Sequence, residues 1–285
     1  MREFRFIEEK IFRVFMFLST AIIALALLLI VASILFKGLP ALTWAMVSQI
    51  PKGGFYFGKE GGILNAIIGS AYLSIGASVL AFGISLPVAL YMNVHLVKRK
   101  KLLNTIRFFL DLLWGVPSIV YGAFGFGVMI FFGFKTSLLA GIITVTIFII
   151  PIMVRGMDEV LKTVPRGLLE ASYSLGSTKS ETAYRVFFKQ GFAGIVTAFL
   201  LAFGRAIGDA ASVLFTTGYT DSIPTSLTQP TATLPLAIFF QLSSPIEEVR
   251  TRAYASAVVL TLFILFISML SRYTSKRYQK NKIQF

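Results

Sequence analysis

Two charged residues in an otherwise apolar stretch are the first candidates for chemistry in this sequence. Arg205 and Asp209 lie four residues apart in the run 192–217, so in a helix they share one face. Either charge at the centre of a membrane helix costs about 2.5 to 3.5 kcal/mol, so both should face each other or a water-filled path. Arginine binds oxyanions through two parallel N–H donors, and a nearby carboxylate can hold that arginine when the site is empty. The pair predicts an anion path or, as the alternative, a buried ion pair that locks helix packing.

Two glycines flank this pair, and they complete the candidate translocation path. Gly204 and Gly208 form a small-xxx-small pattern, which lets another helix approach closely and narrows a path beside it. The candidate path residues are therefore Gly204, Arg205, Gly208 and Asp209.

Other chemistries find little support in the composition. The chain has no cysteine and one histidine, which excludes disulfides, thiolate chemistry and a metal site of several histidines within it. Residues 176–180 end in Lys-Ser but lack the glycine beside the lysine that a phosphate-cradling loop requires. We therefore expect no cofactor, no metal and no ATP site in this chain, and no enzymatic activity of its own.

A second candidate site lies in a polar, basic segment between two long apolar runs. Pro165 suits the first turn of a helix, and Gly176 can end that helix in a left-handed conformation. Thr178 and Glu181 have the spacing of a capping box for a second helix. The segment is expected to fold as two short helices joined at a glycine.

The first of these short helices is expected to dock on another protein. Leu168, Ser172 and Leu175 have the spacing of one helical face, and a helix on a loop has no core of its own to cover. The alternative is a loop that only re-enters the membrane domain, without a partner. The candidate docking residues are Glu170, Ala171, Ser172, Leu175 and Gly176.

The composition indicates an integral membrane protein that is all-α. Hydrophobic residues make up 56% of the chain and charged residues 14%, with a mean hydropathy of +0.78. Spanning helices need about 17 to 25 apolar residues. The run 61–97 is too long for one span, so we expect it to begin late, start as an interfacial segment or break near Pro87. Residues 233–242 are expected to form a short interfacial or re-entrant helix. The six expected spans lie at 14–36, 61–97, 108–134, 136–154, 192–217 and 253–271.

The net charge of +14 follows from membrane topology rather than from nucleic-acid binding. Twenty of the 27 lysines and arginines fall in the segments that are cytoplasmic if both termini are inside. The expected organisation is a cytoplasmic segment 1–13, a transmembrane domain 14–272 with a cytoplasmic coupling loop at about 155–190, and a basic tail 273–285.

Several motifs together resemble the A-type permease subunit of phosphate ABC importers, the PstA family, over nearly the whole chain. The matching segments are 61–70, 115–122, 150–155, the Glu170-Ala171-Ser172 loop with Gly176, and the stretch that begins at Arg205. The sequence departs from the family pattern at Asp209, where the family has Glu, and at Ala210 and Ser212, where it has Thr and Pro. It also lacks the prolines that follow the family's docking loop.

The resemblance implies a six-helix permease of the type I ABC importer kind in a bacterial inner membrane. It further implies pairing with a second homologous permease, two ATP-binding subunits and an external phosphate-binding protein. Arg205 would then contact the anion and the Glu170 loop would contact the ATPase. Two alternatives stay open: a permease for sulfate, molybdate or phosphonate, and a proton-coupled secondary carrier that uses Asp209.

Overall fold

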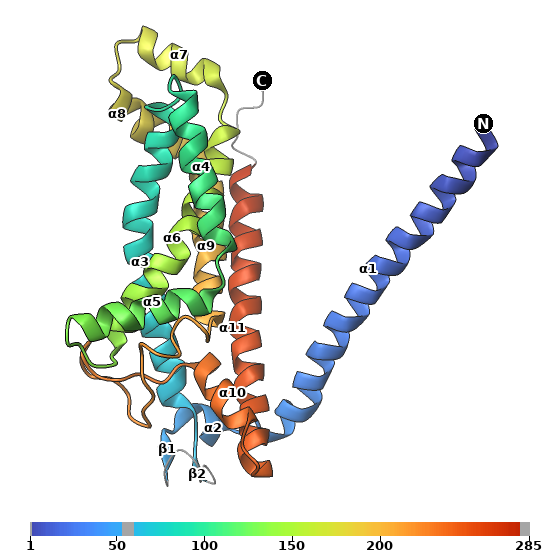
Figure 1. The fold of residues 1–285 in the computed structure, drawn as a ribbon, viewed down its shortest axis with the longest axis vertical. Coiled ribbons are helices and arrows are strands. Elements are labelled where there is room, and N and C mark those ends of the chain that lie inside the picture. The colour runs from blue at the N-terminus through green and yellow to red at the C-terminus, as the bar shows by residue number, and fades with distance from the viewer. Residues whose placement is uncertain (1, 53–59, 280–285) are drawn as a thin grey trace.

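The computed structural model describes residues 2–52 and 60–279, and these residues are mostly helical (Figure 1). The short elements are the 3-10 turn η1 (Leu39–Ala41), α2 (Trp44–Ser48), α7 (Arg166–Ser174), α8 (Lys179–Glu181), the π-helical turn η2 (Thr182–Phe187) and α10 (Leu234–Leu242). The longer helices are α1 (Arg2–Gly38), α3 (Leu64–Val94), α4 (Lys100–Gly115), α5 (Ser118–Phe131), α6 (Leu138–Lys162), α9 (Phe188–Gly208) and α11 (Glu247–Gln279). One small antiparallel ribbon, β1 (Pro51–Lys52) with β2 (Glu60–Gly61), pairs Pro51 with Gly61.

Within the described residues, five helices are long and apolar enough to cross a membrane, and the bent pair α4 and α5 is a sixth candidate. The run 108–134, expected to be one span, is not a single continuous helix, because the chain bends by 93° between these two helices. Val116 adopts an extended conformation before Pro117, whose ring disfavours helix at the preceding residue. α5 therefore crosses the bundle instead of continuing α4 (Figure 1).

Of three other elements, the fifth span differs in part from the sequence-based expectations, and α3 and α10 agree with them. α3 begins late, at Leu64, which is one of the three alternatives for the run 61–97, and it runs unbroken through Pro87. The fifth span ends at Gly208, and residues 211–217 form turns rather than helix. The short helix expected at 233–242 is confirmed as α10, where the Thr233 side chain accepts a hydrogen bond from the Leu236 amide.

The core of the bundle lies between α3 and α6. Small buried residues follow one side of α3 at helical spacing, which allows α6 to approach closely. Thr146 on α6 donates a hydrogen bond to the Ala77 carbonyl on α3 at 3.3 Å. Ile149 and Met153 of α6 are fully buried in the same cluster. This rigid pair carries the elements that hold the candidate site.

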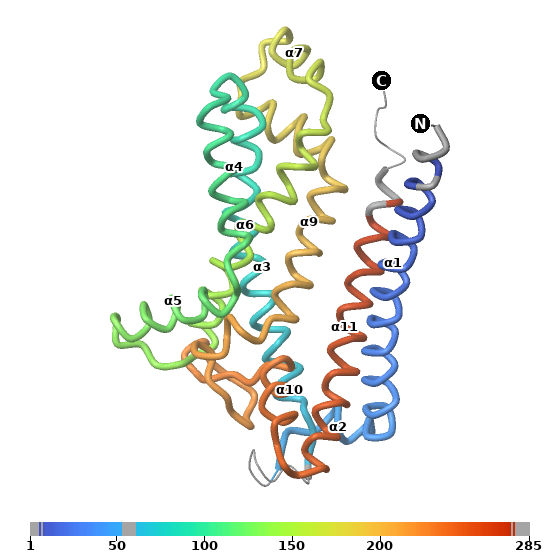
Figure 2. Tube along the Cα trace, turned by 45° about the vertical axis from the view of Figure 1, so that its right-hand side comes forward, coloured from blue at the N-terminus to red at the C-terminus, as the bar shows by residue number. Residues whose placement is uncertain are grey.

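α1 diverges from the other helices toward its N-terminal end (Figure 1) and contacts α11 (Figure 2). Near Gly38 the two helices are close, since an added Cβ would lie 2.4 Å from the Tyr254 carbonyl oxygen. Most α1 side chains are exposed. The N-terminal end of α1 and the C-terminal end of α11 lie at the same end of the molecule as α7 (Figure 1).

Candidate functional site

Arg205 lies in the last turn of α9, and its side chain is exposed in the isolated chain. Its guanidinium carbon is 5.3 Å from the ring centroid of Phe148 on α6. Within the described residues Arg205 forms no ion pair and no hydrogen bond. A cation with free N–H donors, in a helix built to cross a membrane, is an arrangement suited to binding an anion.

Asp209 does not share a helical face with Arg205, contrary to the sequence-based expectation. α9 ends at Gly208, and Asp209 has extended backbone angles (φ −89°, ψ 122°). Its carboxylate accepts a hydrogen bond from the Ser212 amide at 2.8 Å. A short carboxylate at the start of a turn commonly caps the amide three residues on. Asp209 therefore stabilises the turn that follows α9 instead of pairing with Arg205.

Two motifs that are far apart in sequence meet next to this turn. A Cβ on Gly122 of α5 would lie 2.7 Å from the Ala211 carbonyl oxygen, so only glycine fits there. The neighbouring Tyr121 packs edge to face against Phe148, with ring centroids 5.5 Å apart. The 115–122 motif and the Arg205 stretch thus form one site at the junction of α5, α6 and α9.

The glycine pair of α9 is less tightly packed than the sequence suggests. A Cβ on Gly204 would lie 4.0 Å from Ile267, and one on Gly208 would lie 3.6 Å from Ile264, both on α11. These are ordinary van der Waals distances, so α11 packs on this face without requiring glycine. The closest approach near Arg205 occurs at Gly122 instead.

The segment 165–181 folds as two short helices joined at a glycine, as the sequence predicts. Gly176 has φ +80° and follows α7, and the Ser177 amide donates to the Ser172 carbonyl at 3.2 Å, which is the closing bond of a Schellman motif. The Thr178 side chain and the Glu181 carboxylate form the expected capping box. These local signals give α7 a defined end and α8 a defined start.

The expectation that Leu168, Ser172 and Leu175 share one docking face is wrong. The Ser172 hydroxyl is buried and lies 2.9 Å from the Thr182 hydroxyl, so this residue holds α7 against η2. Leu175 is 86% exposed, and Glu170 and Ala171 are exposed with it. Four of the five candidate docking residues, Glu170, Ala171, Leu175 and Gly176, are therefore exposed on α7 or directly after it, together with Arg166, Gly167 and Ser174.

Tyr173 lies on the inner side of α7. Its hydroxyl is buried without a hydrogen-bond partner in the described part of the chain, and this burial raises the pKa of the phenol. Tyr173 therefore stays neutral at any pH near 7, and it adds a further fixed contact beneath the helix.

A buried charge cluster that the sequence reasoning missed links α3, α4 and α6. Asp158 is fully buried, and its carboxylate accepts two hydrogen bonds of 2.9 Å from Arg107. It also accepts hydrogen bonds from Asn93 and Arg155, each at 2.8 Å, while the Lys162 ammonium lies at 3.3 Å. A carboxylate with this many donors is well satisfied despite its burial. The cluster fixes the end of α6 that leads directly into α7.

One signal in the sequence could have pointed to this cluster. Arg155, Asp158 and Lys162 follow each other at spacings of three and four on an apolar helix, which places them on one face. The partners Asn93 and Arg107 come from other helices. Nothing local to α6 indicates them.

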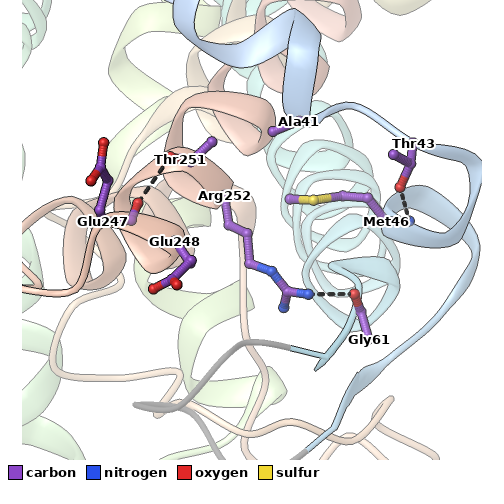
Figure 3. Close-up of a pocket in the computed structure, with 8 residues that line it drawn as sticks. All are labelled: Ala41, Thr43, Met46, Gly61, Glu247, Glu248, Thr251 and Arg252. Carbon is purple, nitrogen blue, oxygen red and sulfur yellow. Dashed lines mark hydrogen bonds between the residues drawn. The ribbon is translucent and has the colours of Figure 1, made fainter.

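A cavity of about 400 Å³ (Figure 3) lies where α2, β2 and the start of α11 come together, at the end of the molecule away from α7 (Figure 1). Arg252 of α11 reaches across it and donates a hydrogen bond to the Gly61 carbonyl at 2.8 Å (Figure 3). The lining residues are Ala41, Thr43, Met46, Gly61, Glu247, Glu248, Thr251 and Arg252. This cavity joins α11 to the segment before α3, and it contains none of the predicted path residues.

The fold defines a class: a membrane component with several candidate spans, a short exposed helix between two of them, and an arginine at the end of a spanning helix that has no ion pair in the described part of the chain. The sequence model of the family described as "Binding-protein-dependent transport system inner membrane component" matches residues 85–280. The family is one of transport components, so the chain is a transport subunit and not an enzyme.

Curated relatives narrow the class. A phosphate transport system permease protein PstA from Yersinia pestis is 33% identical over 261 residues, covering 87% of this chain and 88% of the relative. The protein of the same name from Pasteurella multocida is 32% identical over 246 residues, covering 85% of each chain. The chain therefore belongs to the binding-protein-dependent transport family and, within it, to the PstA permeases.

Solved structures support the fold. A chain of the MetNI methionine ABC transporter in an inward-facing conformation superposes with a TM-score of 0.62 at 18% identity. The match covers 75% of this chain and 95% of that chain. The all-α architecture of a type I ABC importer permease, expected from the sequence, is confirmed.

Proposed function

We propose that this chain is a membrane-spanning subunit of an ATP-driven phosphate importer and forms half of its translocation path. Anion binding is proposed from one observation. Within the described residues, Arg205 lies beside the Phe148 ring and keeps all its N–H donors free. A guanidinium with free donors can bind a phosphate oxyanion bidentately. The names of the curated relatives support phosphate as the anion.

In this proposal the subunit works within a larger assembly in a bacterial inner membrane. A second, related permease completes the path, one of two ATPase subunits docks on the α7 surface, and an external phosphate-binding protein delivers the anion at the opposite end. The basic loops support a cytoplasmic orientation for the termini, as does the position of the N-terminal end of α1 and the C-terminal end of α11 at the same end of the molecule as α7 (Figure 1).

The mechanism couples movement at α7 to the path. ATP binding closes the ATPases and displaces α7, whose contact with η2 through Ser172 transmits the movement to the base of α9. The Asp158 cluster ties the end of α6 to α3 and α4, so these helices move with it as one body. Rocking of the two permeases opens the path outward and lets phosphate pass from the binding protein to Arg205.

The experiment is uptake of radiolabelled phosphate into liposomes that contain this subunit, its companion permease and the ATPase. The binding protein is added outside and ATP is enclosed. Uptake that requires both ATP and the binding protein is the expected result. A complex that assembles and hydrolyses ATP but imports sulfate, molybdate or phosphonate instead would refute the assignment of the anion. Uptake by this chain alone, driven by a proton gradient, would refute the importer itself.

A further inference from the structure

The guanidinium of Arg205 lies over an aromatic ring that is itself deeply buried. Its carbon is 5.3 Å from the Phe148 centroid, within the distance at which a cation is attracted to a ring face. Phe148 is only 4% exposed. We propose that Phe148 is a positioning residue whose ring face holds the Arg205 guanidinium in the path and leaves its N–H donors available to the anion. This inference rests on the anion-binding role proposed for Arg205.

The choice of an aromatic partner has a chemical reason. A carboxylate partner would neutralise the guanidinium and occupy its N–H groups, so it would compete with an incoming oxyanion. An aromatic ring interacts with the cation through its electron-rich face, and the N–H donors at the guanidinium edge stay free. The acid nearest in sequence, Asp209, is engaged with the Ser212 amide. The ring thus stabilises the charge without competing for the ligand.

The orientation of the Phe148 ring is fixed by its neighbours. Tyr121 packs against it with an interplanar angle of 61°. The Tyr121 hydroxyl donates a hydrogen bond of 2.9 Å to the Leu113 carbonyl on the other side of the bend between α4 and α5. The ring therefore cannot tilt away from Arg205 unless the α4–α5 bend also changes.

The test separates an electronic role of the ring from a packing role. Fluorine withdraws electron density from the ring face while changing its volume little, so phenylalanines with one, two and three fluorines weaken the attraction to a cation and also the edge-to-face contact with Tyr121, for which the Phe199 series below is the control. Each is incorporated at position 148 in the complete transporter. We measure phosphate imported per ATP hydrolysed at saturating binding protein. Phe148→Leu and Phe148→Tyr are measured alongside.

We expect the phosphate-to-ATP ratio to fall stepwise along the fluorine series. Phe148→Leu, which has no ring, should lower the ratio by about 2- to 30-fold, the range that corresponds to the loss of one cation–ring contact. Phe148→Tyr should retain most of it. The same fluorine series at Phe199 is the matched control, because that ring lies on α9 and packs edge-on against Phe82 at 5.5 Å.

Two results would overturn the inference. A flat fluorine series at position 148 in a complex that imports phosphate would show that the ring only fills space. An equal decline at Phe199 would show that fluorination disturbs the bundle in general. If the proposed phosphate import is itself wrong, the unmodified complex imports no phosphate at all, and this distinguishes that failure from both results.

Discussion

Replacement of Gly176 by alanine tests the coupling role of α7 with a perturbation of known size. Gly176 has φ +80°, and a Cβ added there meets no other atom within 4 Å. The cost of Gly176→Ala is therefore only the backbone strain of an L-residue in the left-handed region, about 1 to 2 kcal/mol. A penalty of this size lowers the population of the observed loop conformation by about 5- to 30-fold. We expect the ATPase subunit to bind the permease complex more weakly by the same factor.

Gly133→Ala is the matched control. Gly133 has φ +71° and, like Gly176, no atom within 4 Å of an added Cβ, but it lies in the connection between α5 and α6, at the end of α6 away from α7. Gly133→Ala introduces the same backbone strain outside the proposed docking surface. Because nothing in the docking loop is altered, the affinity for the ATPase should change less than about twofold.

The assay is a titration of the ATPase subunit against the purified permease pair in nanodiscs. Gly176→Pro should weaken binding further than Gly176→Ala, because proline cannot adopt a positive φ and also removes the amide that donates to Tyr173. Gly176→Asn should recover part of the affinity, because asparagine tolerates the left-handed region. Equal losses at positions 133 and 176, or full affinity in Gly176→Pro, would refute the docking role.

Three further predictions concern the path and the core. Arg205→Ala should abolish phosphate uptake while the complex still hydrolyses ATP, and Arg205→Lys should restore little uptake, because an ammonium lacks the bidentate fork; normal uptake by the alanine variant would assign Arg205 to packing. Asp209→Asn should transport nearly normally, because its amide oxygen still accepts from Ser212, whereas Asp209→Ala should lose about 0.5 to 2 kcal/mol of stability, measured by thermal unfolding. Asp158→Asn should destabilise the protein by about 3 to 5 kcal/mol because it breaks a buried ion pair. The neighbouring, exposed Glu159→Gln should cost about 1 kcal/mol or less in the same melting assay.

The features that the sequence predicted well depend on near neighbours along the chain. The end of α7 at Gly176 and the capping box at Thr178 each involve residues within five positions of one another. A left-handed glycine and a Thr-x-x-Glu spacing have few alternative structures, so their conformation can be inferred without knowledge of the fold. The long apolar runs likewise predicted the spanning helices, because the length and hydropathy of a run are read from consecutive residues.

The errors arose where a local cap competes with the helix or where contacts between distant segments determine the outcome. Arg205 and Asp209 have ideal helical spacing, yet α9 stops between them because the Asp209 carboxylate caps the following turn. The turn is held further by a hydrogen bond from the Ser137 amide to the Thr216 carbonyl, a contact between distant segments. The run 61–97 left three alternatives open, and the packed core decides between them, since α3 begins late and continues through Pro87. Spacing alone cannot show which backbone groups find distant partners.

The Asp158 cluster also constrains the order in which the chain is built into the membrane. Arg107 leaves the ribosome 51 residues before Asp158, the carboxylate that satisfies it. Until α6 is synthesised, Arg107 lacks the buried carboxylate that binds it in the folded chain, and its guanidinium needs water or a lipid headgroup as its partner instead. We therefore expect α4 to reach its final packed position only after α6 has brought Asp158 into place.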